Sequence, residues 1–283
     1  MWTIVRLTVL ETWRKRLLPA TVLMTAAFFA LFWFLLRAMH DSIPPSYVQS
    51  STTALFGMGI GSQYLGLFFV YFLIAFFSIF SMVGAVSGEV EQGLLAAIIP
   101  RPIRRYEVIL GKWAGFAFVQ AVFVTIVLFG LMAEVHQWFS TVPIVTTYSV
   151  QAWMLFVLEA WVISAATLCG STFFPAVANG VVVAILFGAA FLAGSAEQIV
   201  AMAPQHVAGF LYAGVVTNLI LPSDGLYRRA LHVIGGPLAA AFGGFAGPFG
   251  AAQPPSSALV VYAVFYLAAV LALAVWRFER RDL

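Results

Sequence analysis

The residue of this sequence best suited to chemistry is Glu159, a carboxyl side chain near the middle of an apolar run. A charge at the centre of a membrane-spanning helix costs at least about 2.5 kcal/mol on insertion scales. Glu159 therefore either lines a substrate route or relays a proton, or it is a protonated or hydrogen-bonded structural glutamate. Gln120 and Asn179, in two other apolar runs, are candidate hydrogen-bond partners across helices and candidate pathway residues.

Other catalytic and ligand-binding patterns are missing from the sequence. Gly111-Lys112 cannot belong to a phosphate loop, because G-x-x-x-x-G-K-[ST] would need glycine at Tyr106 and a hydroxyl at Trp113. The four histidines lack metal-ligand spacing, no G-x-S-x-G elbow is present, and the single Cys169 is interpreted as a small apolar helix residue. We therefore predict no catalytic residue, metal site or cofactor in this chain.

The composition indicates which elements position these residues. The chain is 63% hydrophobic and only 9% charged, with a mean hydropathy of +1.00, whereas about a quarter of the residues of soluble domains are charged. A transmembrane helix needs about 20 apolar residues, and six runs qualify: 18–36, 64–86, 113–133, 152–170, 176–194 and 258–276. We predict an all-α integral membrane protein with six transmembrane helices in one domain, residues 1–283.

Basic residues predict the orientation of these helices. Eleven of the 14 Lys and Arg residues lie before the first run, between the second and third runs, or after the last run, whereas Arg37, Arg228 and Arg229 lie elsewhere. Cytoplasmic loops carry the excess of Lys and Arg, so both termini are predicted to be cytoplasmic, in a plasma or inner membrane. The bases lie beside membrane ends rather than on a soluble face, so we predict contacts with membrane lipids and no nucleic-acid partner.

Three segments outside the spans have a predicted structure. Residues 1–17 show helical periodicity with two Trp on the apolar face, which is typical of a helix lying in the membrane interface. Residues 40–63 are predicted as an external loop whose glycines indicate a turn or close packing. Residues 195–257 are predicted as an external cap of interfacial or re-entrant helices; if 207–221 and 231–250 both crossed the membrane, there would be eight spans.

A polar island, residues 87–112, separates the second and third runs. It holds three of the chain's acids and four of its bases. A helix through its first half has an apolar side and a polar side, and Pro100 and Pro102 end it. An ordinary basic internal loop is one interpretation, and a docking surface for a soluble partner is the other. The apolar side consists of Val90, Leu94, Leu95, Ile98 and Ile99, and the opposite side of Glu89, Gln92, Gly93 and Ala96.

The island resembles a loop of the permease subunits of ABC type-2 transporters, which follows a pattern like E-x-x-x-G-T-L-E-x-L-L-x-x-P-x-x-R-x-x-x-x-x-G-K. This chain departs from the pattern at Leu94, where the family prefers Thr, and at Ala96, where it often has Glu. The order of the predicted helices and the basic end of the chain, residues 280–283, are also similar to that family. The residues that match the pattern are Glu89, Gly93, Leu95, Pro102, Arg105, Gly111 and Lys112.

The resemblance implies a function and its partners. The chain would be the permease subunit of an ATP-driven exporter, not itself an enzyme, with two such subunits, identical or paralogous, enclosing the substrate pathway as a dimer. The island would contain a coupling helix seated on an ATP-binding cassette ATPase, present in two copies per complex and holding the ATP and Mg. The docking and coupling residues would be Glu89, Glu91, Gly93, Leu94, Leu95, Ile98, Ile99, Pro102, Arg105, Gly111 and Lys112.

Two functions of other classes remain open at the level of sequence. An integral membrane enzyme or maturation factor would use Glu159 and the external cap, and it would need more converging polar residues near one membrane face than the sequence offers. An ATP-independent channel or carrier often shows internal repeats with broken helices, and no convincing repeat is present. The substrate is left open among lipids, amphiphiles and small ions.

Overall fold

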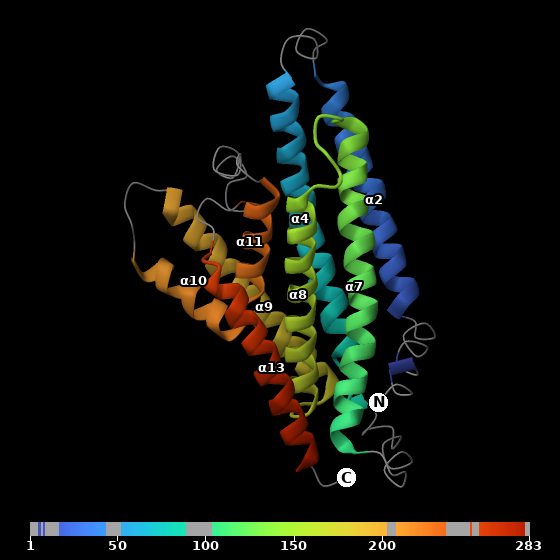
Figure 1. The fold of residues 1–283 in the computed structure, drawn as a ribbon, viewed down its shortest axis with the longest axis vertical. Helices are drawn as coiled ribbons and strands as arrows, with labels where there is room; N and C mark the ends of the chain where they lie inside the picture. Colours follow the sequence, from blue (N-terminus) through green and yellow to red (C-terminus); the bar gives the residue numbers. More distant parts are fainter. Residues whose placement is uncertain are drawn as a thin grey trace.

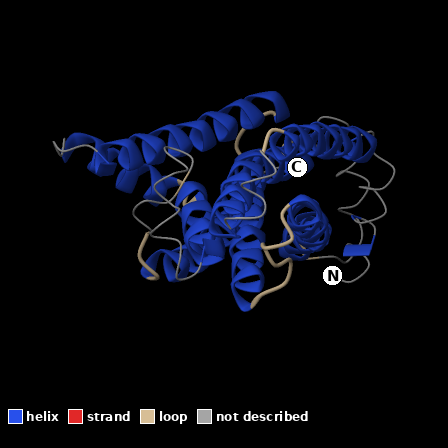
Figure 2. Ribbon diagram, turned by 90° about the horizontal axis from the view of Figure 1, so that it is seen from above, coloured by secondary structure: helices blue, strands red, loops and turns tan. Residues whose placement is uncertain are grey.

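The structure, a computed structural model, describes residues 5, 6, 8, 17–43, 52–88, 104–202, 208–235, 250 and 255–280. The described residues form long helices and contain no strand (Figures 1 and 2). These helices are α2 (Leu17–Asp41), α4 (Thr52–Met82), α7 (Arg105–Trp138), α8 (Thr147–Ser171), α9 (Ala176–Met202), α10 (Ala208–Ile220), α11 (Ser223–Gly235) and α13 (Ala258–Glu279).

Six helices of the described part are long and apolar enough to cross a membrane: α2, α4, α7, α8, α9 and α13. This finding confirms the prediction of an all-helical, multi-pass membrane protein with six candidate spans. The helices α10 and α11 have 13 residues each and are therefore about 20 Å long. The hydrocarbon core of a bilayer is about 30 Å thick, so neither helix by itself has the length of a span. Most of the second segment of the eight-span alternative, 231–250, lies outside the described residues.

Helix α8 lies at the centre of the bundle. It packs against α4, α7, α9, α11 and α13, and Figure 1 shows it between α7 and the group formed by α9, α10 and α11. Most of α4 and α8 is buried inside the protein, whereas only a small share of α2, α9 and α13 is buried. The exposed surfaces are apolar, which suits helices that face lipid or another membrane subunit.

The second predicted span was placed too late in the chain. Helix α4 begins at Thr52 rather than at residue 64, and it ends at Met82, so the three glycines of the predicted external loop lie within the helix. Gly59 is closely packed there, because a Cβ atom at this position would lie 2.6 Å from a side-chain methyl of Val142. Close packing, one of the two roles predicted for these glycines, is therefore confirmed at Gly59, and the turn is not.

Several other helices also continue beyond their apolar runs. Helix α2 reaches Asp41, α7 begins at Arg105 rather than at residue 113, and α9 continues to Met202. The reason is physical: hydropathy marks the part of a helix that matches the hydrocarbon, while hydrogen bonding of the backbone carries the helix on into the polar interface. As a consequence, Gly111 and Lys112 are part of a helix and not of a loop.

Parts of three predicted segments lie outside the described residues. Of the predicted interfacial helix, 1–17, the structure describes residues 5, 6, 8 and 17. Of the polar island, it describes 87–88 and 104–112, so the predicted coupling helix lies outside. Of the predicted cap, 195–257, it describes 195–202, 208–235, 250 and 255–257.

Candidate functional site

A buried lysine at the end of the polar island contacts the turn that precedes the island. Lys112, in the third turn of α7, is 7% exposed, and its Nζ donates a hydrogen bond of 2.6 Å to the backbone oxygen of Ala85. Ala85 lies in the turn that follows α4, where carbonyl groups lack the intrahelical donors that they would have inside a helix. The lysine ammonium group therefore supplies a hydrogen-bond donor to a carbonyl group at the end of α4.

An apolar cluster surrounds this bond. Lys112 has the length to bury its aliphatic stem in such a cluster while its ammonium group reaches a polar atom. The cluster draws side chains from the end of α4, the start of α7, the second half of α8 and the end of α13. Its buried members include Met82, Val86, Val108, Ile109, Phe116, Leu168 and Phe278.

Two further contacts hold the start of α7 in place. Arg105 Nη1 donates to the backbone oxygen of Glu279, at the end of α13, over 3.1 Å; Figure 1 shows these two helix ends at the same end of the molecule. Gly115 is approached by the N-terminal segment, since a Cβ atom there would lie 2.9 Å from the Cβ of buried Thr8. We call the contacts of Ala85, Arg105 and Lys112 the α4–α7 anchor.

The anchor contains two of the predicted docking and coupling residues, Arg105 and Lys112, and a third, Gly111, lies beside Lys112. Gly111 and Lys112 are buried among the described residues of the bundle. Arg105 is bound to the end of α13. The other predicted docking residues lie outside the described residues: Glu89, Glu91, Gly93, Leu94, Leu95, Ile98, Ile99 and Pro102.

Glu159 lies where the sequence predicted, in the middle of a central span. It is the thirteenth of the 25 residues of α8, its side chain is fully buried, and neither carboxyl oxygen has a hydrogen-bond partner in the described part of the chain. Gln120 is also fully buried, and its side-chain amide likewise has no partner there.

The predicted hydrogen bonds between Glu159 and these two amides are not formed. Asn179 instead uses its Nδ2 to donate to the backbone oxygens of Val83 and Thr167, each at 2.9 Å. Asn179 is in the first turn of α9 and meets the end of α8, and Thr167 is eight residues, or about 12 Å, along α8 from Glu159. Its described role is therefore to join the ends of α4, α8 and α9.

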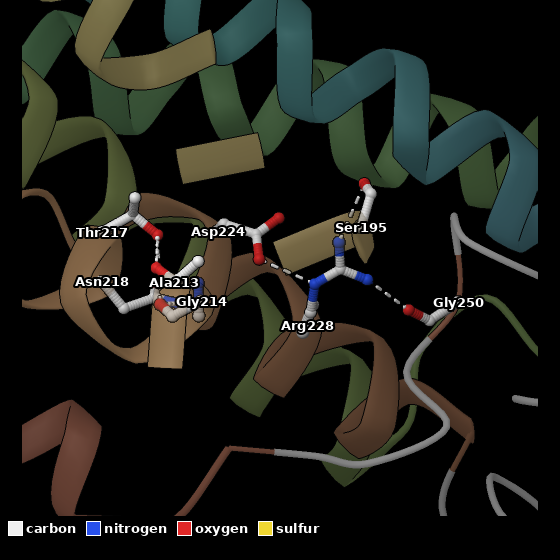
Figure 3. Close-up of polar contacts among 9 residues, drawn as sticks. Ser195, Ala213, Gly214, Thr217, Asn218, Asp224, Arg228 and Gly250 are labelled. Carbon is white, nitrogen blue, oxygen red and sulfur yellow. Dashed lines mark hydrogen bonds and ion pairs between the residues drawn. The ribbon is translucent and has the colours of Figure 1, made fainter. Parts of the chain in front are cut away.

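A buried ion pair on α11 was not predicted from the sequence. Arg228 Nε lies 2.7 Å from Asp224 Oδ2, and both side chains are almost completely buried. Arg228 also donates from Nη1 to the backbone oxygen of Gly250 at 2.8 Å and from Nη2 to Ser195 Oγ at 3.2 Å (Figure 3). The guanidinium group thus joins α11 to α9 and to the segment that precedes α13.

One signal of this pair was present in the sequence. Asp224 and Arg228 are four residues apart, the spacing at which opposite charges meet on one helix face. From the sequence, Arg228 was counted only among the three bases that lie away from the predicted cytoplasmic segments. Its burial could not be read from local pattern, since the covering groups come from α9 and from Gly250.

Burial dominates the electrostatics of α11. It raises the pKa of the Asp224 carboxyl, and the neighbouring Arg228 opposes that rise. Burial also raises the pKa of the Tyr227 hydroxyl well above its ordinary value. The pKa of His232 is lowered, first by burial and then by Arg229. Helix α11 therefore carries its one buried charge pair in surroundings that disfavour any further charge.

Comparison with known proteins does not assign this arrangement. No family model matches the chain, and no curated protein matches it. Among the described residues, no three His, Cys, Asp or Glu side chains come together as metal ligands. The described geometry offers a mechanical anchor at one end of the bundle and a buried polar centre inside it.

Proposed function

We propose that this chain is the membrane-spanning permease subunit of an ATP-driven exporter that is similar to ABC type-2 transporters. Two copies, or one copy and a paralogue, would form the pathway, and an ATP-binding cassette ATPase would dock on the polar island. In this proposal both termini and the anchor are cytoplasmic. The short helices α10 and α11 then form a re-entrant external segment before the last span.

The observation that supports this proposal best is the α4–α7 anchor. The structure describes the chain up to residue 88 and again from residue 104, and the Lys112 to Ala85 bond joins α7 to the turn that follows α4. A force applied to the island is therefore delivered to α4 and α7 together. Both helices pack against central α8, so displacement of the island moves packed elements of the core and not a loose loop.

The experiment is to purify the chain with its ATPase from the cells that make both. Leu95→Asp and Ile98→Asp place charges on the predicted apolar docking side, and they are expected to abolish association because an unpaired charge at an apolar interface is costly. The matched control is Val145→Asp, on the exposed link between α7 and α8 at the opposite end of the bundle. This control should associate like the unaltered chain.

Two results would contradict the proposal. If the docking-side variants keep the ATPase bound, the predicted docking face is wrong. If no ATPase accompanies the chain, and the chain alone in vesicles carries out transport or catalysis, the ATP-driven mechanism is wrong. Transport would then favour an ATP-independent channel or carrier, and catalysis would favour a membrane enzyme. Thermal unfolding of each variant in detergent shows whether the spans remain folded, so loss of association is not confused with loss of structure.

A further inference from the structure

Five buried oxygen atoms from three helices have no hydrogen-bond partner among the described residues. They are Tyr71 Oη of α4, both carboxyl oxygens of Glu159 of α8, and Ser223 Oγ and Asp224 Oδ1 of α11. Unpaired buried polar atoms are rare, and each costs free energy. Figure 3 shows the corresponding geometry at Asp224, with one carboxyl oxygen turned toward Arg228 and the other turned away.

These atoms belong to one neighbourhood, which we call the oxygen cluster. Glu159 interacts electrostatically with Asp224. The hydroxyl of Tyr71 interacts with both carboxyls and lies next to the hydroxyl of Ser223, yet neither hydroxyl has a partner in good hydrogen-bond geometry. The rings of Tyr71 and Tyr227 are stacked with centroids 4.4 Å apart, so α4 and α11 are in direct contact here.

The ionisable groups around the oxygen cluster come from four helices. Glu159 is the contribution of α8. The helices α7 and α13 also pack against α8, and no described titratable group of theirs interacts with Glu159. The remaining groups are Tyr64 and Tyr71 of α4, Glu197 of α9, and Asp224, Tyr227 and Arg228 of α11.

The charges of the cluster do not balance when every group is ionised. The charge of Arg228 is matched by Asp224 at 2.7 Å. Glu159 then holds an unmatched negative charge at the centre of a span, where it has no donor among the described residues. Burying an isolated carboxylate costs so much that such a group takes up a proton instead.

A proton also completes the hydrogen bonding. The protonated carboxyl of Glu159 adds one O–H donor to those of Tyr71 and Ser223, and the carbonyl oxygen of Glu159 and Oδ1 of Asp224 can accept. A larger occupant would have to separate the stacked rings of Tyr71 and Tyr227, which bring α4 and α11 into contact here. A metal cation is disfavoured because no three His, Cys, Asp or Glu side chains of the described residues come together as metal ligands and the Arg228 guanidinium is bound to the Asp224 carboxylate.

We propose that Glu159 is a proton-binding site whose occupancy is coupled to the packing of α11 against α4 and α8. With the proton bound, the centre is neutral and α11 stays packed. Loss of the proton leaves an unpaired negative charge, which is stabilised only when α11 moves away and admits water. This inference concerns the chain itself and holds with or without an ATPase partner.

The first test detects the proton directly. Infrared spectra of the purified chain in lipid nanodiscs should show the carbonyl stretch of a protonated carboxyl at neutral pH, and Glu159→Gln should remove it. Glu107→Gln, at the partly exposed start of α7, is the matched control and should leave the band unchanged. Two results overturn the proposal: a spectrum without any band that depends on Glu159, or a band that sodium ions remove at constant pH, which would assign an alkali-cation site.

The second test follows α11. Ala230, fully buried on α11, is changed to cysteine in a Cys169→Ala background, and its labelling by a maleimide is measured against pH. The reference is Ser42→Cys in the same background, in the exposed turn after α2. The labelling rate of Ala230→Cys is divided by that of the reference to correct for thiol ionisation. If opening releases one proton, this corrected rate should rise by roughly tenfold per pH unit between the pKa of Glu159 in the open form and its pKa in the closed form.

The Glu159→Gln form of the same cysteine variant distinguishes the mechanism. Its amide cannot release a proton, so its corrected labelling rate should stay flat over the same pH range. If the two forms show the same pH dependence, Glu159 does not control α11 and the coupling is wrong. Infrared spectra and ATPase co-purification are independent measurements, so failure of this inference and failure of the proposed function are distinguishable.

Discussion

Replacing Asp224 by Asn should destabilise the protein more than any other single polar substitution in α11. The change removes one charge and preserves shape, so Arg228 keeps its bonds to Gly250 and Ser195. What it loses is the carboxylate at 2.7 Å that compensates its charge. Because the guanidinium cannot be deprotonated in a protein, Asp224→Asn leaves a permanent charge in the interior.

The expected size follows from the burial of the pair. Removing one partner of a buried ion pair costs about 3–5 kcal/mol. Arg228→Met should cost less, about 1–3 kcal/mol, although it deletes three hydrogen bonds. The reason is that the Asp224 carboxyl, left without its partner, can take up a proton and become neutral. Burial already favours this change because it raises the pKa of the carboxyl.

The assay is reversible unfolding of the purified chain in mixed micelles, with the free energy of unfolding compared between the two single variants and the double variant. The double variant should be more stable than Asp224→Asn alone, because it contains no unpaired guanidinium. The reasoning is refuted if Asp224→Asn costs less than about 1 kcal/mol, the range of an exposed pair, or if Arg228→Met is the more damaging of the two.

Three further predictions use the same unfolding assay. Lys112→Met should lower the free energy of unfolding by about 1.5–3 kcal/mol. Arg105→Gln, which removes an exposed donor, should lower it by less than about 1 kcal/mol. Equal effects would show that burial of the lysine is unimportant. Asn179→Ala should cost about 1–3 kcal/mol because it removes both donor bonds to Val83 and Thr167, and an unchanged midpoint would contradict that role. Gly59→Ala should cost about 1–3 kcal/mol because the added Cβ atom would overlap with Val142. Gly61 has open space around it, so Gly61→Ala should be neutral or should stabilise the protein by about 0.5–1 kcal/mol. The reverse order would contradict the described packing.

The number and location of the spans were predictable because membrane thickness imposes a length on apolar runs. All six predicted runs fall largely within the six candidate spanning helices. The ends were less predictable, since α4 and α7 continue through polar residues once backbone bonding is established. At Gly59 the sequence was compatible with a turn or with close packing. The contact with Val142, more than 80 residues away in the chain, shows close packing.

The buried polar centre was predictable only in part. An acid within an apolar run is visible in sequence, and so Glu159 was identified. Its neighbours depend on how each helix is rotated about its axis, which hydrophobic runs do not specify when a helix is apolar on all sides. Asn179 was therefore assigned to the wrong neighbour, and Asp224, which interacts with Glu159 from α11, was not assigned at all.

The anchor and the oxygen cluster both involve α4, and this connection gives the two proposals a common mechanical basis. Tyr71 of the cluster and Ala85 of the anchor are 14 residues apart on α4 and its terminal turn, about 20 Å, and α4 and α8 pack against each other. Asn179 holds the end of α4 to α8 through its bonds to Val83 and Thr167, so these helices move together when the island is displaced. Helix α11 is fastened elsewhere, to α9 and to the segment before α13, through Arg228. A displacement of the island therefore acts where α11 packs against α8 and α4, including the stacked Tyr71 and Tyr227 rings. At this contact the proposed proton on Glu159 determines whether α11 stays packed.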